Sequence, residues 1–487
     1  MTRHIVAIDQ GTTSSRAILF DETGKPLTSH AREFPQHYPQ DGRVEHDPED
    51  IWRDTVACVM EVLTDDTVAI GITNQRETII LWDRENGRPL HNAIVWQDRR
   101  TADLCRNLKN EGYEPRITEK TGLLLDPYFS ATKLVWLLDH VDGAREAAAR
   151  GALACGTIDS FLLWRLTGGK VHATDITNAG RTMLCDIHAG EWDDELLTLF
   201  GVERSLLPEI RGNSEIYGET DPALFGRAIP IAGMAGDQQA AVIGQACFEP
   251  GMVKSTYGTG CFLLLNTGTE ALASQNRLLS TPAYRIDGET HYALEGSIFV
   301  AGAAIKWLRD KLGLITDAAD SEEIARAVPD DHGITLVPAF VGLGAPHWEP
   351  DARGLITGMT LDTTADHIVR ATLESIAFQT RDLIDAMRAD GAEMPSAIRI
   401  DGGMAQNGWF AQFLADVLDT PVERPESHET TALGAAFLAG LATGVWNGLD
   451  ELSAGWEADA SFAPDMEAER RNDLLAHWKK ALDRALL

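Results

Sequence analysis

The stretch Asp9-Gln10-Gly11-Thr12-Thr13-Ser14-Ser15-Arg16 decides the fold, because it stands at the tip of a predicted β-hairpin. Apolar runs precede it over residues 4–8 and follow it over 17–20, as expected for two buried strands. The glycine lets the backbone approach a ligand closely, while the hydroxyls and free N–H groups can surround phosphate oxygens. This pattern favours a nucleotide-phosphate hairpin, although a plain polar turn has the same composition.

Two further properties narrow the kind of phosphate site. The chain contains no G-x-x-x-x-G-K-[ST] sequence, so the hairpin is not a Walker loop. Asp9 ends the first strand, where its hard carboxylate can bind Mg²⁺ directly or through water.

Length and composition indicate a globular protein with more than one domain. A chain of 487 residues, 44% of them hydrophobic and 24% charged, predicts two or three domains. The net charge of −32 argues against nucleic acid and anionic membranes as partners. Met1 leads directly into a strand, and no apolar run approaches the roughly 18 residues of a membrane span. We expect a soluble protein without membrane insertion.

The six cysteines support a cytoplasmic location. They lie among apolar neighbours and form no C-x-x-C pair, which favours buried reduced thiols over disulfides or zinc ligands. These residues are Cys58, Cys105, Cys155, Cys185, Cys247 and Cys261.

Strand and helix patterns alternate along the chain, which predicts an α/β fold. Near residue 250 the design of the opening hairpin restarts: strand-like residues 251–256 and 261–265 enclose the glycine-and-hydroxyl turn 257–260. Two such hairpins predict a duplicated fold with a cleft between two lobes. We place the lobes at 1–248 and 249–487.

Eight segments together resemble the sugar-kinase family of the actin/hexokinase/heat-shock-70 ATPase superfamily, and within it the members that act on glycerol. The segments are DQGTTSSR (9–16), TNQRET (73–78), IVWQDRR (94–100), DPYFSATK (126–133), AGDQQAA (235–241), TYGTGCF (256–262), GLGAPHW (342–348) and DGGMAQN (401–407). The resemblance covers nearly the whole chain. It implies two related ribonuclease H-like (actin-like ATPase) domains with the catalytic site in the cleft between them. By the same resemblance, the N-terminal lobe 1–248 binds glycerol and carries the first phosphate hairpin, and the C-terminal lobe 249–487 binds the nucleotide and carries the second.

The resemblance also implies an activity, its ligands and an assembly. By resemblance, the chain is expected to use Mg²⁺-ATP to phosphorylate glycerol to sn-glycerol 3-phosphate, the first step of glycerol catabolism, with Asp9 holding the metal. Relatives of this kind form dimers or tetramers.

The substrate side of the implied site begins after the predicted strand 68–72. Arg76 and Glu77 follow that strand, at the end where open α/β sheets place ligands, and offer donors and acceptors for vicinal hydroxyls. By resemblance these two residues bind the glycerol hydroxyls. The resemblance also implies that Trp96 and Phe262 form an apolar wall against the carbon chain and that the Tyr128 hydroxyl contacts the substrate.

Asp237 is the predicted catalytic residue. It lies between a predicted strand over 230–235 and a helix that begins near 238, so it is also a candidate helix N-cap, a structural role that is the alternative interpretation but is compatible with catalysis. By resemblance Asp237 accepts the proton of the attacking hydroxyl and Gln238 contacts a neighbouring hydroxyl. Phosphoryl transfer asks mainly for orientation, so a weak base suffices.

The nucleotide side is implied by the same resemblance and spans both lobes. Its residues are Thr12, Thr13, Ser14, Arg16, Thr259, Gly302, Lys306, Gly403 and Asn407. Lys306 stands where glutamine is common in relatives. The loop over 220–227 is shorter and less glycine-rich than the loop that binds fructose 1,6-bisphosphate in enteric relatives, so that regulation is not carried over.

Two other functions remain open at this stage. A kinase for another polyol or a ketose has the same fold, and so does an actin- or chaperone-like ATPase switch. The switch leaves Arg76, Glu77, Trp96 and Tyr128 without a purpose, since it needs no small polar pocket.

Overall fold

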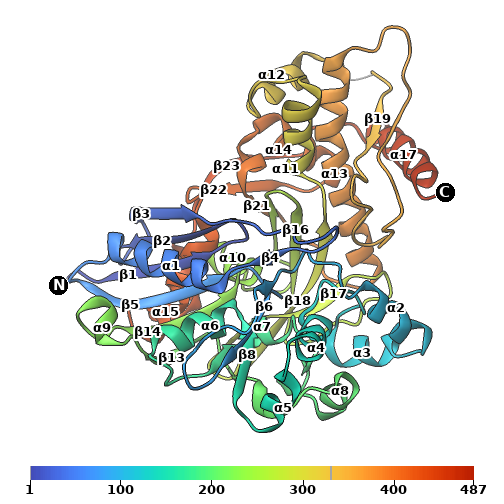
Figure 1. Ribbon diagram of the computed structural model, residues 1–487. Helices are drawn as coiled ribbons and strands as arrows, with labels where there is room; N and C mark the ends of the chain where they lie inside the picture. The colour runs from blue at the N-terminus through green and yellow to red at the C-terminus, as the bar shows by residue number, and fades with distance from the viewer. Residues whose placement is uncertain (1, 330–331) are drawn as a thin grey trace.

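The computed structural model describes residues 2–329 and 332–487 and is built on two large mixed sheets (Figure 1). The first sheet has the strand order β13-β14-β5-β1-β2-β3 and the second has the order β17-β18-β16-β15-β21-β22-β23. The strands of the first are β1 (His4–Gln10), β2 (Ser14–Phe20), β3 (Pro26–Glu33), β5 (Thr67–Asn74), β13 (Ser214–Glu219) and β14 (Pro230–Gly236). Those of the second are β15 (Val253–Tyr257), β16 (Cys261–Gly268), β17 (Leu279–Ile286), β18 (Glu289–Ile298), β21 (Ile398–Asp401), β22 (Val422–Pro425) and β23 (Ala458–Phe462).

The two sheets share one succession of strand pairings. In the first sheet β1 pairs antiparallel with β2 and parallel with β5, and β5 continues parallel to β14. In the second sheet β15, β16, β21 and β22 repeat these pairings in the same order. The outer strands also correspond, because β3 and β18 are antiparallel additions on one side and β13 and β23 on the other. The duplicated architecture predicted from the two hairpins is therefore confirmed.

Both faces of the first sheet are covered by helices. Along β1, Ile5 and Ala7 belong to one buried cluster and Val6 and Ile8 to another. Helices α1 (Pro48–Val62) and α6 (Ile158–Leu166) cover the Val6 face, while α10 (Asp237–Gly244) and α15 (Thr430–Ala442) cover the Ile5 face. Full burial of side chains of this size stabilises the fold by about 1.5–3 kcal/mol each. This explains the continuous apolar run before the opening turn.

Helices α10 and α15 connect the two halves of the chain. Their cluster also contains Leu264 of β16 and Ala293 of β18, so it reaches from the first sheet to the second. Helix α15, orange-red in Figure 1, belongs to the second half of the sequence but packs on β1, β5 and β14.

The other helices cover the outer faces. Around the second sheet, α11, α13, α14 and α17 enclose a separate core, and α12 packs on α13 and α14 at the top of Figure 1. The helices not yet bounded are α2 (Ala102–Asn110), α3 (Glu114–Thr121), α4 (Ser130–His140), α5 (Ala144–Ala149), α7 (Ile176–Ala179), α8 (Asp194–Phe200), α9 (Pro222–Phe225), α11 (Gly302–Trp307), α12 (Asp320–Ala327), α13 (Ala365–Ala389), α14 (Gly408–Leu418), α16 (Leu449–Ala454) and α17 (Ala468–Ala485).

Small sheets complete the structure. A four-stranded sheet joins β4 (Glu45–His46), β7 (Ala93–Ile94), β6 (Ile79–Asp83) and β8 (Leu153–Thr157). The two-stranded sheets are β9 (Ala173–Asp175) with β12 (Glu209–Arg211), β10 (Cys185–Asp186) with β11 (Glu191–Trp192), and β19 (Thr335–Val337) with β20 (Leu355–Thr357).

Several sequence-based expectations can be compared with this architecture. The predicted strands over 68–72, 230–235 and 397–401 are β5, β14 and β21. All six cysteines are buried and free. No helix within the described parts of the chain combines the length and apolarity of a membrane span.

Candidate active site

The substrate side of the site starts in a strained turn after β5. Glu77 has a φ of 62°, which is rare for a residue with a side chain. The turn is supported on both sides: Thr78 N donates to Arg76 O at 2.7 Å, and Ser130 Oγ donates to Glu77 O at 2.9 Å. Strain held in place in this way is typical of functional sites.

Arg76 and Glu77 lie inside a buried network of alternating charges. Arg76 binds Glu295 of β18 through two contacts, Nη1 to Oε2 at 2.5 Å and Nη2 to Oε1 at 3.2 Å. Arg181 bridges the network, because its Nη2 donates to Glu295 Oε1 at 2.9 Å and its Nε to Glu77 Oε1 at 2.6 Å. Although burial alone would raise it, the pKa of Glu295 falls to about 2 because both guanidiniums favour the carboxylate. Sequence analysis identified neither Arg181 nor Glu295.

The predicted aromatic wall forms from three separate segments. The Trp96 ring lies edge-on to Tyr128, with centroids 5.6 Å apart, and edge-on to Phe262 at 6.5 Å. The Arg76 guanidinium carbon lies 5.8 Å from the Phe262 centroid. The three aromatic side chains and the Arg76 end of the charge network therefore border one another.

Asp237 adjoins this network as the first residue of α10. The N-cap is Gly236 and not Asp237, so the alternative N-cap interpretation is wrong. Asp237 Oδ1 accepts from Gln238 N at 2.7 Å and lies 3.3 Å from Arg76 Nε. Burial raises the pKa of Asp237 above its ordinary 3.8, against the opposing charges of Arg76 and Lys254. One third of the side chain is still exposed. A carboxylate with a raised pKa and an open side can accept a proton.

Gln238 is held by a buried lysine from the second sheet. Lys254 Nζ of β15 donates to Gln238 Oε1 at 2.5 Å and to Thr256 Oγ1 at 2.9 Å. Burial lowers the pKa of Lys254. The predicted substrate side thus contains residues of both sheets.

The first hairpin is connected to both sides of the site. Gly11 N donates to Ser14 O at 2.9 Å and closes the turn that carries Thr12 and Thr13. The indole Nε1 of Trp96 donates to Thr12 Oγ1 at 3.0 Å, so the phosphate hairpin directly adjoins the aromatic wall. Arg16 pairs with Asp9 at 2.6 Å and with Glu429 at 2.7 Å.

Glutamine side chains and His46 form a hydrogen-bond network with the backbone of this hairpin. Gln75 Nε2 donates to Gln10 Oε1 at 3.1 Å and to Gly11 O at 3.0 Å. Gln36 donates to Thr12 O at 3.0 Å and bonds to His46 Nε2 at 2.7 Å. Burial lowers the pKa of His46 to about 4, so the imidazole stays neutral at pH 7.

In the second lobe, the predicted nucleotide residues Thr259, Gly302 and Gly403 are defined by their backbone contacts and by the space around them. Thr259 O accepts from Ala301 N and Ala303 N, both at 3.0 Å, which joins the second hairpin to α11. Gly302 has to be glycine, because a Cβ there would lie 2.5 Å from Gly258 O. A Cβ on Gly403 would meet no atom within 4 Å, which leaves room for a ligand.

Asn407 and Lys306 differ from the other members of this set. Asn407 caps α14 by accepting from Phe410 N at 2.9 Å, and its Nδ2 donates to Ser321 Oγ at 3.2 Å. Its amide oxygen and one of its two N–H groups are therefore used within the protein. Lys306 is exposed on α11.

The donor set suits magnesium bound together with phosphates. Asp9 and Ala235 both lie opposite Thr73, so β1 and β14 end on either side of β5 and bring Asp9 and Asp237 to one edge. Residues 2–329 and 332–487 contain no group of three or more His, Cys, Asp or Glu placed to hold a metal. Mg²⁺ needs only one or two carboxylates beside phosphate oxygens, so the residues present fit it.

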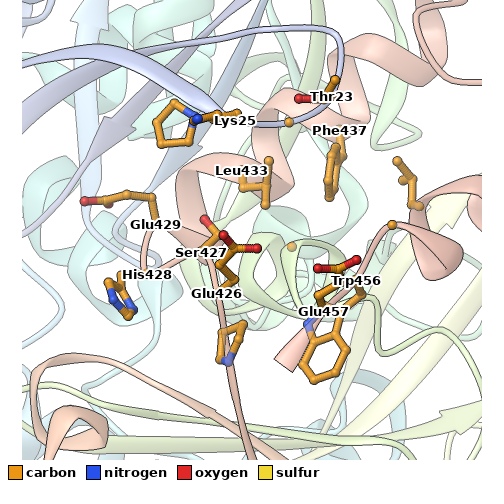
Figure 2. Close-up of a pocket in the computed structure, with 16 residues that line it drawn as sticks. Thr23, Lys25, Glu426, Ser427, His428, Glu429, Leu433, Phe437, Trp456 and Glu457 are labelled. Atoms are coloured by element: carbon orange, nitrogen blue, oxygen red, sulfur yellow. The ribbon is translucent and has the colours of Figure 1, made fainter. Parts of the chain in front are cut away.

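A separate cavity of about 520 Å³ has Glu429 in its lining (Figure 2). Its walls come from the β2–β3 turn around Lys25 and from the 425–429 loop and Trp456. Glu429 is the residue that this cavity shares with the ion pair at the phosphate hairpin. None of the predicted site residues lines it.

Duplicated sheets, two glycine-and-hydroxyl hairpins and a buried charge network beside a carboxylate define a two-domain kinase of the actin-like class. Residues 4–244 match the N-terminal domain of the FGGY family of carbohydrate kinases, and residues 253–443 match its C-terminal domain. The chain belongs to this family.

Individual relatives agree with this assignment. The chain is 62% identical to a glycerol kinase of Gluconobacter oxydans, over 99% of this chain and 95% of the relative. It is 58% identical to a glycerol kinase of Rhodospirillum centenum, over 99% and 97% of the two chains. Among solved structures, Plasmodium falciparum glycerol kinase with ADP superposes with a TM-score of 0.94 at 40% identity, over 100% of this chain and 99% of that one.

Proposed function

We propose that this chain transfers the terminal phosphoryl group of ATP to glycerol, giving sn-glycerol 3-phosphate and ADP, as the first step of glycerol catabolism. The relatives named glycerol kinase support the substrate. The observation that carries the proposal is the placement of Asp237 3.3 Å from Arg76, beside the Trp96–Tyr128–Phe262 wall. Arg76, Glu77 and Tyr128 bind hydroxyls, and the aromatic rings contact the carbon chain.

Asp237 acts as the general base. Its Oδ1 accepts from Gln238 N, so Oδ2 is the oxygen that takes the proton in this proposal. The terminal hydroxyl oxygen forms a bond to the γ-phosphorus, the bond from that phosphorus to the leaving oxygen of ADP breaks, and the hydroxyl proton passes to Oδ2. A loose transition state makes orientation the main requirement.

The nucleotide lies between the two hairpins, in a cleft between lobes 1–248 and 249–487. Thr12, Thr13, Ser14 and Arg16 bind phosphates from one side and Thr259 from the other. Gly302, Lys306, Gly403 and Asn407 border the adenosine; the open space at Gly403 supports this part most directly. Asp9 holds Mg²⁺, which when bound neutralises charge on the phosphates.

The same proposal makes the enzyme a cytoplasmic homodimer or homotetramer. Six buried free thiols fit a reducing compartment. The assembly rests on family resemblance, and light scattering measures it directly.

Asp237→Asn tests the base. The amide keeps the shape of the side chain but cannot accept the proton, so kcat falls by about 10²–10⁴-fold while glycerol and ATP analogues still bind. A coupled ADP-release assay gives the rate and calorimetry gives the affinities.

Asp221→Asn is the matched control, because Asp221 caps α9 outside the site by accepting from Ala223 N at 3.0 Å. It should keep the wild-type rate. Near-normal turnover in Asp237→Asn removes the residue from the base role, and ADP release independent of glycerol overturns the kinase proposal.

A further inference from the structure

Glu295 and Arg181 contact the substrate-binding pair without facing the open side of the site. Both side chains are fully buried. Glu295 lies between two guanidiniums, because its Oε1 accepts from Arg76 at 3.2 Å and from Arg181 at 2.9 Å. Without that carboxylate, two buried like charges would oppose each other across the gap.

The network determines which Arg76 donors remain for a ligand. A guanidinium has five N–H groups. Glu295 takes one on each Nη, and Gln239 Oε1 takes a second on Nη1 at 3.2 Å. The Nε–H toward Asp237 and one Nη2–H are left.

In the part of the chain that the structure describes, Glu77 likewise has only one of its two carboxylate oxygens left to accept a hydrogen bond from a ligand. Arg181 Nε occupies Glu77 Oε1 at 2.6 Å, and Oε2 of Glu77 has no hydrogen-bond partner within the described residues. Arg181 also lies beneath the aromatic wall, with its guanidinium carbon 5.7 Å from the Tyr128 centroid. One fixed acceptor thus stands beside the two remaining donors of Arg76.

Glu295 reaches this position from the second sheet. Lys254 of β15 lies opposite Leu264 of β16, which lies opposite Glu295 of β18. Residues directly opposite one another share a sheet face, so all three side chains belong to one row. Lys254 and Glu295 stand at the two ends of this row. Lys254 binds Gln238 and Glu295 binds Arg76, and both of these partners belong to the first half of the chain.

We propose that Glu295 and Arg181 are positioning residues that select the donors and acceptor offered to the substrate, and that the polyol site is complete only when the second sheet lies against the first lobe. This inference rests on the proposed function. It makes Glu295 a determinant of substrate affinity that acts through Arg76.

Glu295→Gln is the decisive variant. The amide keeps the volume but loses the charge that holds both guanidiniums, so the KM for glycerol rises by at least about tenfold. The KM for ATP at saturating glycerol stays within about twofold. Glu295→Asp keeps the charge and should fall between wild type and Glu295→Gln. Arg181→Lys, which keeps one charge but cannot bridge two carboxylates, should raise the glycerol KM as well.

Glu374→Gln is the matched control. Glu374 is another buried carboxylate paired with an arginine, Arg370 at 2.8 Å, and it lies on α13 outside the site. It should lower the melting temperature without changing the glycerol KM. If Glu295 had a purely structural role, Glu295→Gln would likewise lower the melting temperature and leave the glycerol KM unchanged. Glycerol KM values within threefold of wild type in Glu295→Gln and Arg181→Lys would overturn the proposal.

The wild-type protein is first assayed with glycerol, dihydroxyacetone, erythritol and xylulose. If another compound has the highest kcat/KM, the proposed function is wrong, and the variants are judged on that compound. The wild-type substrate comparison thus tests the substrate assignment, and the KM values of the variants separately test the positioning role. If Glu295→Gln does not fold, Glu295→Asp and Arg181→Lys decide the question by their KM values.

Discussion

Lys133 is a buried lysine that faces backbone carbonyls. Its Nζ donates to Pro127 O and Tyr128 O at 2.6 Å and to Phe129 O at 3.1 Å. Three carbonyls match the three N–H groups of an ammonium. Lys133 therefore holds the segment that carries Tyr128, one of the predicted substrate-binding residues.

We predict that Lys133→Met raises the glycerol KM several-fold, because an apolar side chain of similar length leaves three buried carbonyls unpaired. The pH dependence separates this effect from general damage. Burial lowers the pKa of Lys133 to about 8, and a neutral amine has only two N–H groups for three carbonyls. The wild-type glycerol KM therefore rises as the pH passes 8, whereas that of Lys133→Met does not respond to this titration.

The effect of Lys133 on folding stability runs in the opposite direction: as the pH rises past 8, glycerol affinity falls but the protein becomes more stable. The folded pKa lies below the ordinary 10.5, so burying the charged form costs stability below about pH 8, and the cost disappears as the pH rises toward 10.5. Steady-state KM values and urea unfolding between pH 7 and 10 measure the two trends. Lys480→Met, at an exposed position, is the control. A wild-type KM that is flat across pH 8 would contradict the role of Lys133.

The sequence could predict side chains at strand ends but not their buried partners. Arg76 and Glu77 stand out because they follow an apolar strand. Glu295 left a weak signal, a carboxylate between apolar residues of a strand. Arg181 left none, because it follows the short helix α7 and meets Glu77 and Glu295 only through contacts distant in sequence.

Among the elements, α10 and α15 approach each other unusually closely. A Cβ on Gly434 would lie 1.8 Å from Ala240 O, and one on Gly244 would lie 1.9 Å from Thr430 O. Both glycines are needed at this crossing because side chains would force the helices apart. Since α10 begins at Asp237, the crossing also fixes the position of the proposed base.

We predict that Gly434→Ala lowers the melting temperature by several degrees. In an unconstrained helix the same change would stabilise by up to about 1 kcal/mol, so a loss shows that the close contact dominates. Scanning calorimetry measures it. Gly455→Ala is the control, because Gly455 has a φ of −84° and a ψ of −7° and a Cβ there would make only ordinary contacts, the nearest at 3.6 Å. An unchanged or higher melting temperature for Gly434→Ala would show that the contact between α10 and α15 does not require glycine at this position.

Prediction succeeded for elements defined by local patterns and failed for their packing. The two hairpins follow from apolar runs around glycine-and-hydroxyl turns. The placement of α15 against the first sheet does not, because this helix is apolar on most of its circumference and its sequence indicates no particular partner. Only the long-range contacts of the whole chain decide which surfaces it covers.

At the scale of the whole molecule, a net charge of −32 surrounds a site proposed to bind a polyanion. Salt screens charges beyond about 10 Å at 0.1 M, so nearby groups matter more than the total. Glu429, from the second half of the chain, reaches the first hairpin through its ion pair with Arg16 at 2.7 Å. Both side chains are about one third exposed, and such a pair adds only about 0–1 kcal/mol of stability.

We therefore predict that Glu429→Gln lowers the KM for ATP about threefold at low salt, with little change in melting temperature. Removing one charge several Å from the phosphates changes their energy by about 0.7 kcal/mol in a water-like dielectric, and Arg16 loses a competing carboxylate. Glu22→Gln removes the same charge at the far end of β2, where Glu22 accepts from Arg3 N at 3.3 Å, and should leave the KM unchanged. Initial rates across a sodium chloride series measure both variants, and the difference between them should disappear as salt increases. Equal shifts in the two variants would instead assign the effect to the total charge of the protein.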